Sequence, residues 1–152
     1  MNKVGIAIIN YNSTEYLDLT LESVFNSKNE TDHVIGIIDN GSNLNEKKKC
    51  KSVVEKYTKK NSRNILYVDS DKNLGFSGGN NVIIKRLLED ESITHICLLN
   101  SDVIVPNRWL DILLKYNKDV IGPVTNAAGN EQTIQVDYSN TTASKIFDLV
   151  NR

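Results

Sequence analysis

The chain has 152 residues, which suits one domain with a sizeable hydrophobic core. Its 18 lysine and arginine residues nearly balance 19 aspartate and glutamate residues, for a net charge of −1. Nucleic-acid binding in general needs a basic surface, so this balance argues against nucleic acid as a partner. The apolar runs are far shorter than the roughly 20 residues that cross a bilayer. We therefore expect a single cytoplasmic domain.

Apolar runs typical of buried strands alternate along the chain with amphipathic patterns typical of helices. The first helix is expected to have Asn12 as its N-cap, with Glu15 in the position of a capping box. Pro106 is expected at the first position of a later helix. The alternation predicts an α/β fold of three layers (α/β/α), in which helices cover both faces of a mainly parallel, Rossmann-like sheet. The predicted strands are 4–9, 34–38, 65–68, 95–99 and 120–124, and the helices after the first lie at 44–60, within 75–88, at 106–116 and at 142–151.

Polar residues stand where four of these strands end. Carboxyl ends of parallel strands meet at one edge of a sheet, and folds of this class bind ligands there. Two interpretations stay open. The polar residues could form turns, because Asn, Ser and Asp bond locally to the backbone. They could instead form a ligand site, with Asp39 and Asp102 as its carboxylates. The stretches are Asn10-Tyr11-Asn12, Asp39-Asn40-Gly41-Ser42, Asp69-Ser70-Asp71 and Asn100-Ser101-Asp102.

The sequence contains neither GxxxxGK[ST] nor a GxGxxG after its first strand, the usual phosphate-binding loops. A phosphate site can instead be built around a divalent cation. Mg²⁺ and Mn²⁺ prefer oxygen ligands and often use one or two carboxylates together with substrate phosphates. Asp102 suits that role. Two explanations stay open for three glycines that lie close together in the sequence, Gly75, Gly78 and Gly79. They could let the start of a helix pack closely against a strand, or they could let the backbone approach a bound nucleotide.

Seven lysines lie between residues 47 and 60, mostly off the apolar stripe of the predicted helix. A solvated helix face is the simpler explanation. Peripheral contact with anionic lipid at the inner face of the membrane is the alternative. Cys50 and Cys97 form no CxxC pair, and we expect them to be buried, reduced thiols, as in a cytoplasmic protein.

Four stretches in combination resemble family 2 glycosyltransferases, which are inverting enzymes of the GT-A fold. They are "VGIAIINYNSTEYLDLTLESV", "IIDNGS", "NLGFSGGNN" and "LLNSDVIVP", and the resemblance continues through "GPVTNAAGNE" into the tail. The chain most resembles rhamnosyltransferase-like, polysaccharide-building members, which implies a bacterial enzyme of the cell envelope. The resemblance covers the nucleotide-sugar-binding half. We therefore expect residues 1–152 to form one truncated GT-A domain without the acceptor-binding half, as a fragment or an unusually short protein.

The resemblance implies roles for the matching residues. Tyr11 would line the nucleotide pocket, and Asp39 would accept a hydrogen bond from the base. Asn100-Ser101-Asp102 matches the D-x-D metal motif of the family, with Asn100 in place of the first aspartate and Asp102 as the retained metal ligand. The loss of one carboxylate should weaken metal binding. The other residues at nucleotide-binding positions are Asn12, Asn73, Gly75, Asn80 and Asn100.

The implied reaction is the transfer of a hexose from a UDP- or dTDP-sugar to a glycan or lipid-linked acceptor, with inversion and with Mn²⁺ or Mg²⁺ as cofactor. The cation would offset the charge that grows on the leaving diphosphate. An inverting transferase also needs a general base. The sequence does not reveal one, because the downstream carboxylates, Glu131, Asp137 and Asp148, match no family motif.

Two other functions stay open, a non-catalytic nucleotide-binding module and a sugar-nucleotide nucleotidyltransferase. The first agrees with the missing base, whereas the second would need a basic, glycine-rich loop after the first strand. The predicted last helix carries the apolar residues Ile146, Phe147 and Val150, which would favour self-association if they stay uncovered.

Overall fold

The computed structural model of the protein describes residues 2–61 and 65–123. Four strands and four helices alternate along these ranges, as the sequence predicts. Among the described residues, no helix is both long enough and apolar enough to cross a membrane. The elements are β1 (Lys3–Asn10), α1 (Thr14–Asn26), β2 (Asp32–Asn40), α2 (Leu44–Asn61), β3 (Leu66–Ser70), α3 (Gly75–Leu87), β4 (His95–Asn100) and α4 (Trp109–Leu114).

The four described strands are all parallel and lie in the order β3-β2-β1-β4. The first strand of the chain is therefore central, with β2 on one side and β4 on the other. The register sets Asn10 opposite Asp39 and Ile9 opposite Asn100. The polar strand ends consequently meet at one edge of the sheet, as expected from the sequence.

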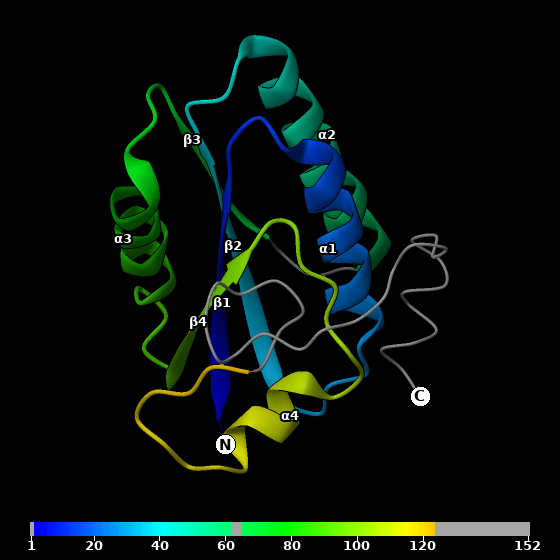
Figure 1. Cartoon of the computed structure of the whole chain (residues 1–152), viewed down its shortest axis with the longest axis vertical. Helices are drawn as coiled ribbons and strands as arrows, with labels where there is room; N and C mark the ends of the chain where they lie inside the picture. The colour runs from blue at the N-terminus through cyan, green and yellow to red at the C-terminus, as the bar shows by residue number, and fades with distance from the viewer. Residues whose placement is uncertain (1, 62–64, 124–152) are drawn as a thin grey trace.

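Helices cover both faces of this sheet (Figure 1), which confirms the predicted three layers. Residues of α1, α2 and α4 pack on one face, where Leu17 and Tyr57 join the core formed by Ile6. On the other face α3 packs through Ile83. A Cβ atom at Gly36 of β2 would lie 2.8 Å from Cγ1 of Ile83, so a glycine there lets α3 lie close to the sheet.

The longest helix, α2, follows its predicted apolar stripe. Cys50, Val54 and Tyr57 are buried, and burial of each large apolar side chain contributes about 1.5–3 kcal/mol. The helix begins where the Asn43 Oδ1 accepts hydrogen bonds from the backbone amides of Asn45 and Glu46, both at 3.1 Å. This contact satisfies two of the amides that a helix start leaves without an internal partner.

Both cysteines are free thiols, with Cys50 fully buried and Cys97 partly buried. Burial raises the pKa of the Cys50 thiol to about 12 and that of Cys97 to about 11. Both therefore stay protonated at neutral pH, which agrees with the predicted structural role.

The predicted N-cap of the first helix is wrong by one residue. Ser13 occupies that position, and Asn12 adopts a left-handed conformation with φ of 51°. Asparagine tolerates this conformation better than most residues. The Asn12 side chain contacts the β2–α2 loop instead of the start of α1.

The predicted helix from Pro106 is too long, since α4 spans only Trp109–Leu114 and follows Arg108, which has φ of 59°. The segment before it is tied to α1 by hydrogen bonds. The Val103 amide donates to the Thr20 hydroxyl and the Val105 amide donates to the Ser23 hydroxyl, each at 3.1 Å. The Arg108 amide donates to the Ser27 carbonyl at 2.6 Å, so the chain is still tied to the end of α1 at Arg108 and the helix begins only at Trp109.

The predicted strand over 120–124 is also wrong for its described part. Residues 120–123 form no strand, and Val120 is 91% exposed. Among residues 2–61 and 65–123, no strand pairs with this apolar run. Val124 and the predicted helix at 142–151 lie outside the described residues, as do Glu131, Asp137, Asp148, Ile146, Phe147 and Val150.

Candidate nucleotide-binding site

Asp39, at the end of β2, is fully buried. Its Oδ1 accepts the backbone amide of Ser42 at 2.9 Å, and its Oδ2 accepts the Asn10 side-chain amide at 3.1 Å. The turn interpretation therefore holds for Asp39, which closes the turn that follows β2. Each carboxylate oxygen has a second lone pair. A base can reach those lone pairs only if the surrounding residues move.

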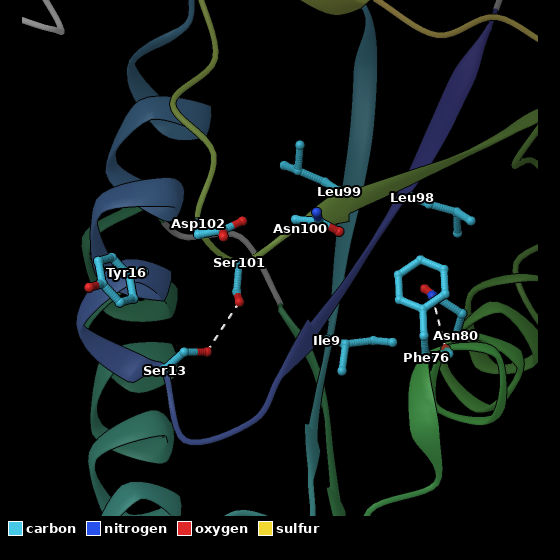
Figure 2. Close-up of a pocket in the computed structure, with 10 residues that line it drawn as sticks. All are labelled: Ile9, Ser13, Tyr16, Phe76, Asn80, Leu98, Leu99, Asn100, Ser101 and Asp102. Atoms are coloured by element: carbon cyan, nitrogen blue, oxygen red, sulfur yellow. Dashed lines mark hydrogen bonds between the residues drawn. The ribbon is translucent and has the colours of Figure 1, made fainter. Parts of the chain in front are cut away.

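Hydrogen bonds continue from Asp39 across β1 to the loop after β4. The Asn10 Oδ1 accepts the Ser13 hydroxyl at 3.2 Å, and the Ser13 and Ser101 hydroxyl oxygens are 3.2 Å apart. Figure 2 shows the contact between Ser13 at the start of α1 and Ser101 on the loop that carries Asp102. We call Asp39, Asn10, Ser13 and Ser101 the strand-end network.

The loops that follow β1 and β2 are joined beside this network. The Asn12 amide donates to the Ser42 hydroxyl at 2.9 Å, and the Asn12 Oδ1 accepts both the backbone and the side-chain N–H of Asn43 at 2.9 Å. Tyr11, one residue earlier, is 48% exposed. The Asn12 side-chain oxygen thus joins the two loops through its bonds with Asn43, while the Tyr11 ring stays accessible.

Asn40 holds the loop between β3 and α3. Its side-chain N–H donates to the Asn73 Oδ1 at 3.0 Å and to the Gly75 carbonyl at 3.2 Å, and its Oδ1 accepts the Leu74 amide at 3.0 Å. Asn40 is itself buried. Its three contacts fix a loop in which two predicted nucleotide-binding residues lie.

A pocket of about 330 Å³ opens where β1 and β4 end, between α1 and α3 (Figure 2). Apolar side chains such as Phe76 and Leu98 form one part of its wall, and the polar residues Asn100 and Asp102 form another. Its volume lies at the lower end of the range for small-molecule sites. The lining residues are Ile9, Ser13, Tyr16, Phe76, Asn80, Leu98, Leu99, Asn100, Ser101 and Asp102.

Asp102 is the sole carboxylate among these lining residues, and it is exposed. Over residues 2–61 and 65–123, no group of three or more His, Cys, Asp and Glu side chains could enclose a metal ion. Side-chain oxygens of Asn100 and Ser101 flank the pocket beside Asp102. This donor set fits a divalent cation shared with a bound diphosphate, and it does not fit one that the described residues hold by themselves.

Three of the predicted site residues therefore line one pocket: Asn80, Asn100 and Asp102. The other five lie in the adjoining loops and strand ends and do not line it: Tyr11, Asn12, Asp39, Asn73 and Gly75.

No individual role is predictable from the sequence for five residues of the site: Asn10, Ser13, Asn40, Ser42 and Ser101. A signal was present for Asn10 and Asn40, because each is a buried polar residue at the last position of an apolar strand. Such a residue needs a hydrogen-bond partner from a neighbouring element. The partner becomes apparent only once the strand order is known.

The family model "Glycosyl transferase family 2" matches residues 5–146, so the chain belongs to that family. A relative in sequence is the teichoic acid poly(glycerol phosphate) polymerase of Staphylococcus epidermidis, 30% identical over 87 residues. That match covers 57% of this chain and 11% of the relative.

Two solved structures are similar to the fold. One is the crystal structure of S. aureus TarS 1–349, with a TM-score of 0.54 and 23% identity, covering 76% of this chain and 31% of that chain. The other is the same protein in complex with UDP, with a TM-score of 0.56 and 20% identity, covering 75% and 32%. This likeness confirms the GT-A-like architecture. The chain spans about a third of these solved chains.

Proposed function

We propose that this chain is the donor-binding part of an inverting hexosyltransferase. Its donor would be a UDP- or dTDP-sugar, and its acceptor a glycan or a lipid-linked glycan. The observation that carries the proposal is the linkage of Asp39 to the loop of Asp102, through Asn10, Ser13 and Ser101, at the carboxyl edge of a parallel sheet. Ligands of such sheets bind at that edge.

Asp39 is the residue that we propose to recognise the base. The ring N–H of uracil and thymine donates a hydrogen bond, whereas the corresponding nitrogen of cytosine has no proton. A carboxylate therefore favours UDP or dTDP over CDP. The half-exposed ring of Tyr11, which follows the strand position opposite Asp39, offers a surface for stacking. The UDP complex of the similar TarS structure supports a uridine nucleotide as the ligand.

Asp102, with Asn100 and Ser101 beside it, is the group that would hold Mn²⁺ or Mg²⁺ together with the diphosphate. When bound, such a cation supplies Lewis-acid stabilisation of the charge on the leaving diphosphate. Asn100 is neutral where the family motif has an aspartate, so we expect weak metal binding in the absence of nucleotide. The amides of Asn80 and Asn100 line the pocket and would orient the donor by hydrogen bonds.

Transfer also requires an acceptor and a general base. The curated relative is named for teichoic acid, which supports a polymer of the cell envelope as the acceptor. The inverting reaction also requires a base that takes the proton of the acceptor hydroxyl. Asp102 is the sole carboxylate that lines the described pocket, and we assign it to the metal.

The second candidate function is a non-catalytic nucleotide-binding module. It is favoured by the assignment of Asp102 to the metal, because no other carboxylate lines the described pocket to serve as the base. A sugar-nucleotide nucleotidyltransferase would hold a triphosphate after β1, where residues 10–13 contain no basic side chain. Membership of family 2 also argues against it.

Thermal unfolding with UDP, dTDP, CDP, GDP and ATP tests the proposal, each with Mn²⁺ or with EDTA. A ligand at 100 times its Kd stabilises the native state by about 2.7 kcal/mol. We expect UDP or dTDP with Mn²⁺ to raise the Tm most. Equal shifts with Mn²⁺ and EDTA would contradict the metal site, and no shift with any nucleotide would contradict the donor-binding role.

A further inference from the structure

We infer that Asn10 and Ser13 are positioning residues that fix the base-recognising Asp39 and the loop of Asp102 at one separation. This inference rests on the proposed function. Asp39 lies at the end of β2 and Asp102 follows β4, and these strands are not neighbours. The strand between them is β1. Any direct mechanical link between the two carboxylates therefore has to cross the end of β1.

The register explains why residue 10 makes this link. Asn10 is paired with Asp39, and Ile9 is paired with Asn100, the residue before Ser101. Asn10 is completely buried, as is Asp39. Its side chain is long enough to reach Asp39 at 3.1 Å on one side and Ser13 at 3.2 Å on the other. Ser13 in turn reaches Ser101.

The chemistry of the four groups determines which one donates in each hydrogen bond of the strand-end network. An ionised aspartate only accepts hydrogen bonds, so Asn10 turns its NH₂ group toward Asp39 and its oxygen toward Ser13. The single proton of Ser13 is then used on Asn10. Ser101 must therefore donate its own proton to Ser13, which leaves only lone pairs on the Ser101 oxygen. That oxygen suits a cation, whereas a phosphate oxygen would need a donor.

The ligand makes such a link useful. In a nucleoside diphosphate, the base and the diphosphate are joined through one ribose, so the distance between them is limited. The groups that bind these two ends must match that distance, and small errors of placement weaken binding and catalysis. A hydrogen-bonded link between Asp39 and the Asp102 loop keeps this distance while the residues that cover Asp39 move to admit the base.

The test compares two serines of the same helix. Ser13 lies at the start of α1, whereas Ser27 lies at its end, is buried, and makes two side-chain hydrogen bonds, to the Val24 carbonyl at 2.6 Å and from the Asn29 amide at 2.7 Å. Ser13→Ala and Ser27→Ala therefore each remove one hydroxyl with two contacts. Calorimetry on the full chain measures the Kd of UDP and of CDP, each with Mn²⁺ and with EDTA.

We expect Ser13→Ala to weaken binding of UDP with Mn²⁺ by about two- to tenfold, the range given by one ordinary hydrogen bond. The preference for UDP over CDP and the gain in UDP affinity from Mn²⁺ should both shrink, because Asp39 and the Asp102 loop are no longer held at a fixed separation. Ser13→Thr, which keeps the hydroxyl, should restore both ratios. Ser27→Ala should lower the Tm and leave both ratios within twofold of the wild type.

Asn10→Ala removes the central residue and should reduce both ratios further. If that variant does not fold, the Ser13 series decides. Ratios in Ser13→Ala that equal those in Ser27→Ala would overturn the inference. If the wild-type chain itself binds no UDP, the proposed function fails and this inference fails with it, a result that is distinct because it appears before any substitution.

Discussion

Asn12 and Asn43 join the loops after β1 and β2: the Asn12 Oδ1 accepts two hydrogen bonds from Asn43, both at 2.9 Å. Asn43 also caps α2 through its own side-chain oxygen. One residue thus holds the start of a long helix and the loop that presents Tyr11.

Asn43→Ala should lower the free energy of unfolding by about 1 kcal/mol, because the cap is lost. Asn43→Asp keeps the capping oxygen but places an accepting oxygen opposite the Asn12 Oδ1 in place of the side-chain N–H. Because the cap is kept, we expect a smaller loss than in Asn43→Ala. Denaturant unfolding of the two variants checks this order. If the aspartate variant is the less stable of the two, the cap is not the dominant contribution of Asn43.

Substitutions at Gly41 and Gly75 distinguish the cost of backbone conformation from the cost of steric crowding. Both glycines have positive φ, 80° and 70°. A Cβ atom at Gly41 would lie 2.3 Å from the Lys72 carbonyl carbon and 2.4 Å from the Asn73 nitrogen, whereas one at Gly75 meets nothing within 4 Å. Gly75→Ala should cost about 1–2 kcal/mol from the left-handed conformation alone.

Gly41→Ala should cost more than that and should also weaken nucleotide binding, because the Asn73 loop must move. Chemical denaturation gives the stability of each variant, and titration with UDP gives its affinity. Equal losses in the free energy of unfolding of the two variants would show that the β3–α3 loop moves away from the added Cβ atom at little cost.

Asp102 and Asp39 should respond differently to removal. Asp102 is exposed, so Asp102→Ala should change the free energy of unfolding by less than about 0.5 kcal/mol while it abolishes the gain in UDP affinity from Mn²⁺. Asp39→Ala leaves the Ser42 amide and the Asn10 side chain without their acceptor. Its expected cost is about 1–3 kcal/mol per unsatisfied group.

Asp39→Asn keeps an oxygen at that position and is the better variant for the base preference, which should narrow between UDP and CDP. Calorimetry at a temperature well below the Tm of each variant measures both effects. A Mn²⁺-dependent UDP affinity that survives in Asp102→Ala would place the metal elsewhere.

The acid stability should depend on Asp111, a carboxylate at the start of α4 that is nearly buried. Burial alone would raise the pKa of Asp111, but hydrogen bonds from the Thr31 side chain, from the backbone amides of Glu30 and Thr31, and from Arg108 outweigh it and hold the pKa well below its usual value.

A carboxylate whose pKa is lower in the folded state stabilises the fold above its unfolded pKa of about 4, and that contribution is lost as the pH falls. Asp111→Asn should therefore cost about 1–3 kcal/mol at pH 7, and the difference from the wild type should shrink below about pH 4. Urea unfolding from pH 7 to pH 3 measures it. A difference that stays constant over this range would argue against the charge of Asp111 as the cause.

This chain alone should bind donor but transfer sugar slowly or not at all. Asp102, the one carboxylate that lines the described pocket, is assigned to the metal, and a reaction without a positioned base is typically slower by about 10²–10⁴. An assay with UDP- and dTDP-sugars and a panel of glycan and lipid-linked acceptors tests this. Turnover near 1 s⁻¹, a common enzyme rate, would reveal a base and an acceptor site within these 152 residues.

The sequence predicted the strands and main helices well, because apolar runs and the stripe of Cys50, Val54 and Tyr57 report burial directly. It failed where the local signal was overridden by distant contacts. Pro106 is a good helix-starting residue, yet hydroxyls of α1 bind the segment before α4, and the Arg108 amide donates to the Ser27 carbonyl. Val120 belongs to an apolar run, but the described chain gives it no neighbouring strand.

The site was predictable in position and less so in detail. Strand ends and the Asp102 pocket follow from alternating elements and polar breaks. The roles of Asn10 and Ser101 depend on β1 lying between β2 and β4, and spacing along the sequence does not encode that order. Asp39 was expected to face either a turn or a base. The structure shows the turn, in which the Ser42 amide donates to the Asp39 Oδ1.

The central place of β1 also determines how the sheet can form during synthesis. Residues 3–10 are synthesised about 90 residues before one of their two partner strands, residues 95–100. Until that strand is made, one edge of β1 lacks its native partner. Long-range parallel pairing of this kind is slow to form and exposes chains to aggregation. A lower level of expression, which keeps the concentration of incomplete chains low, should therefore raise the yield of folded protein.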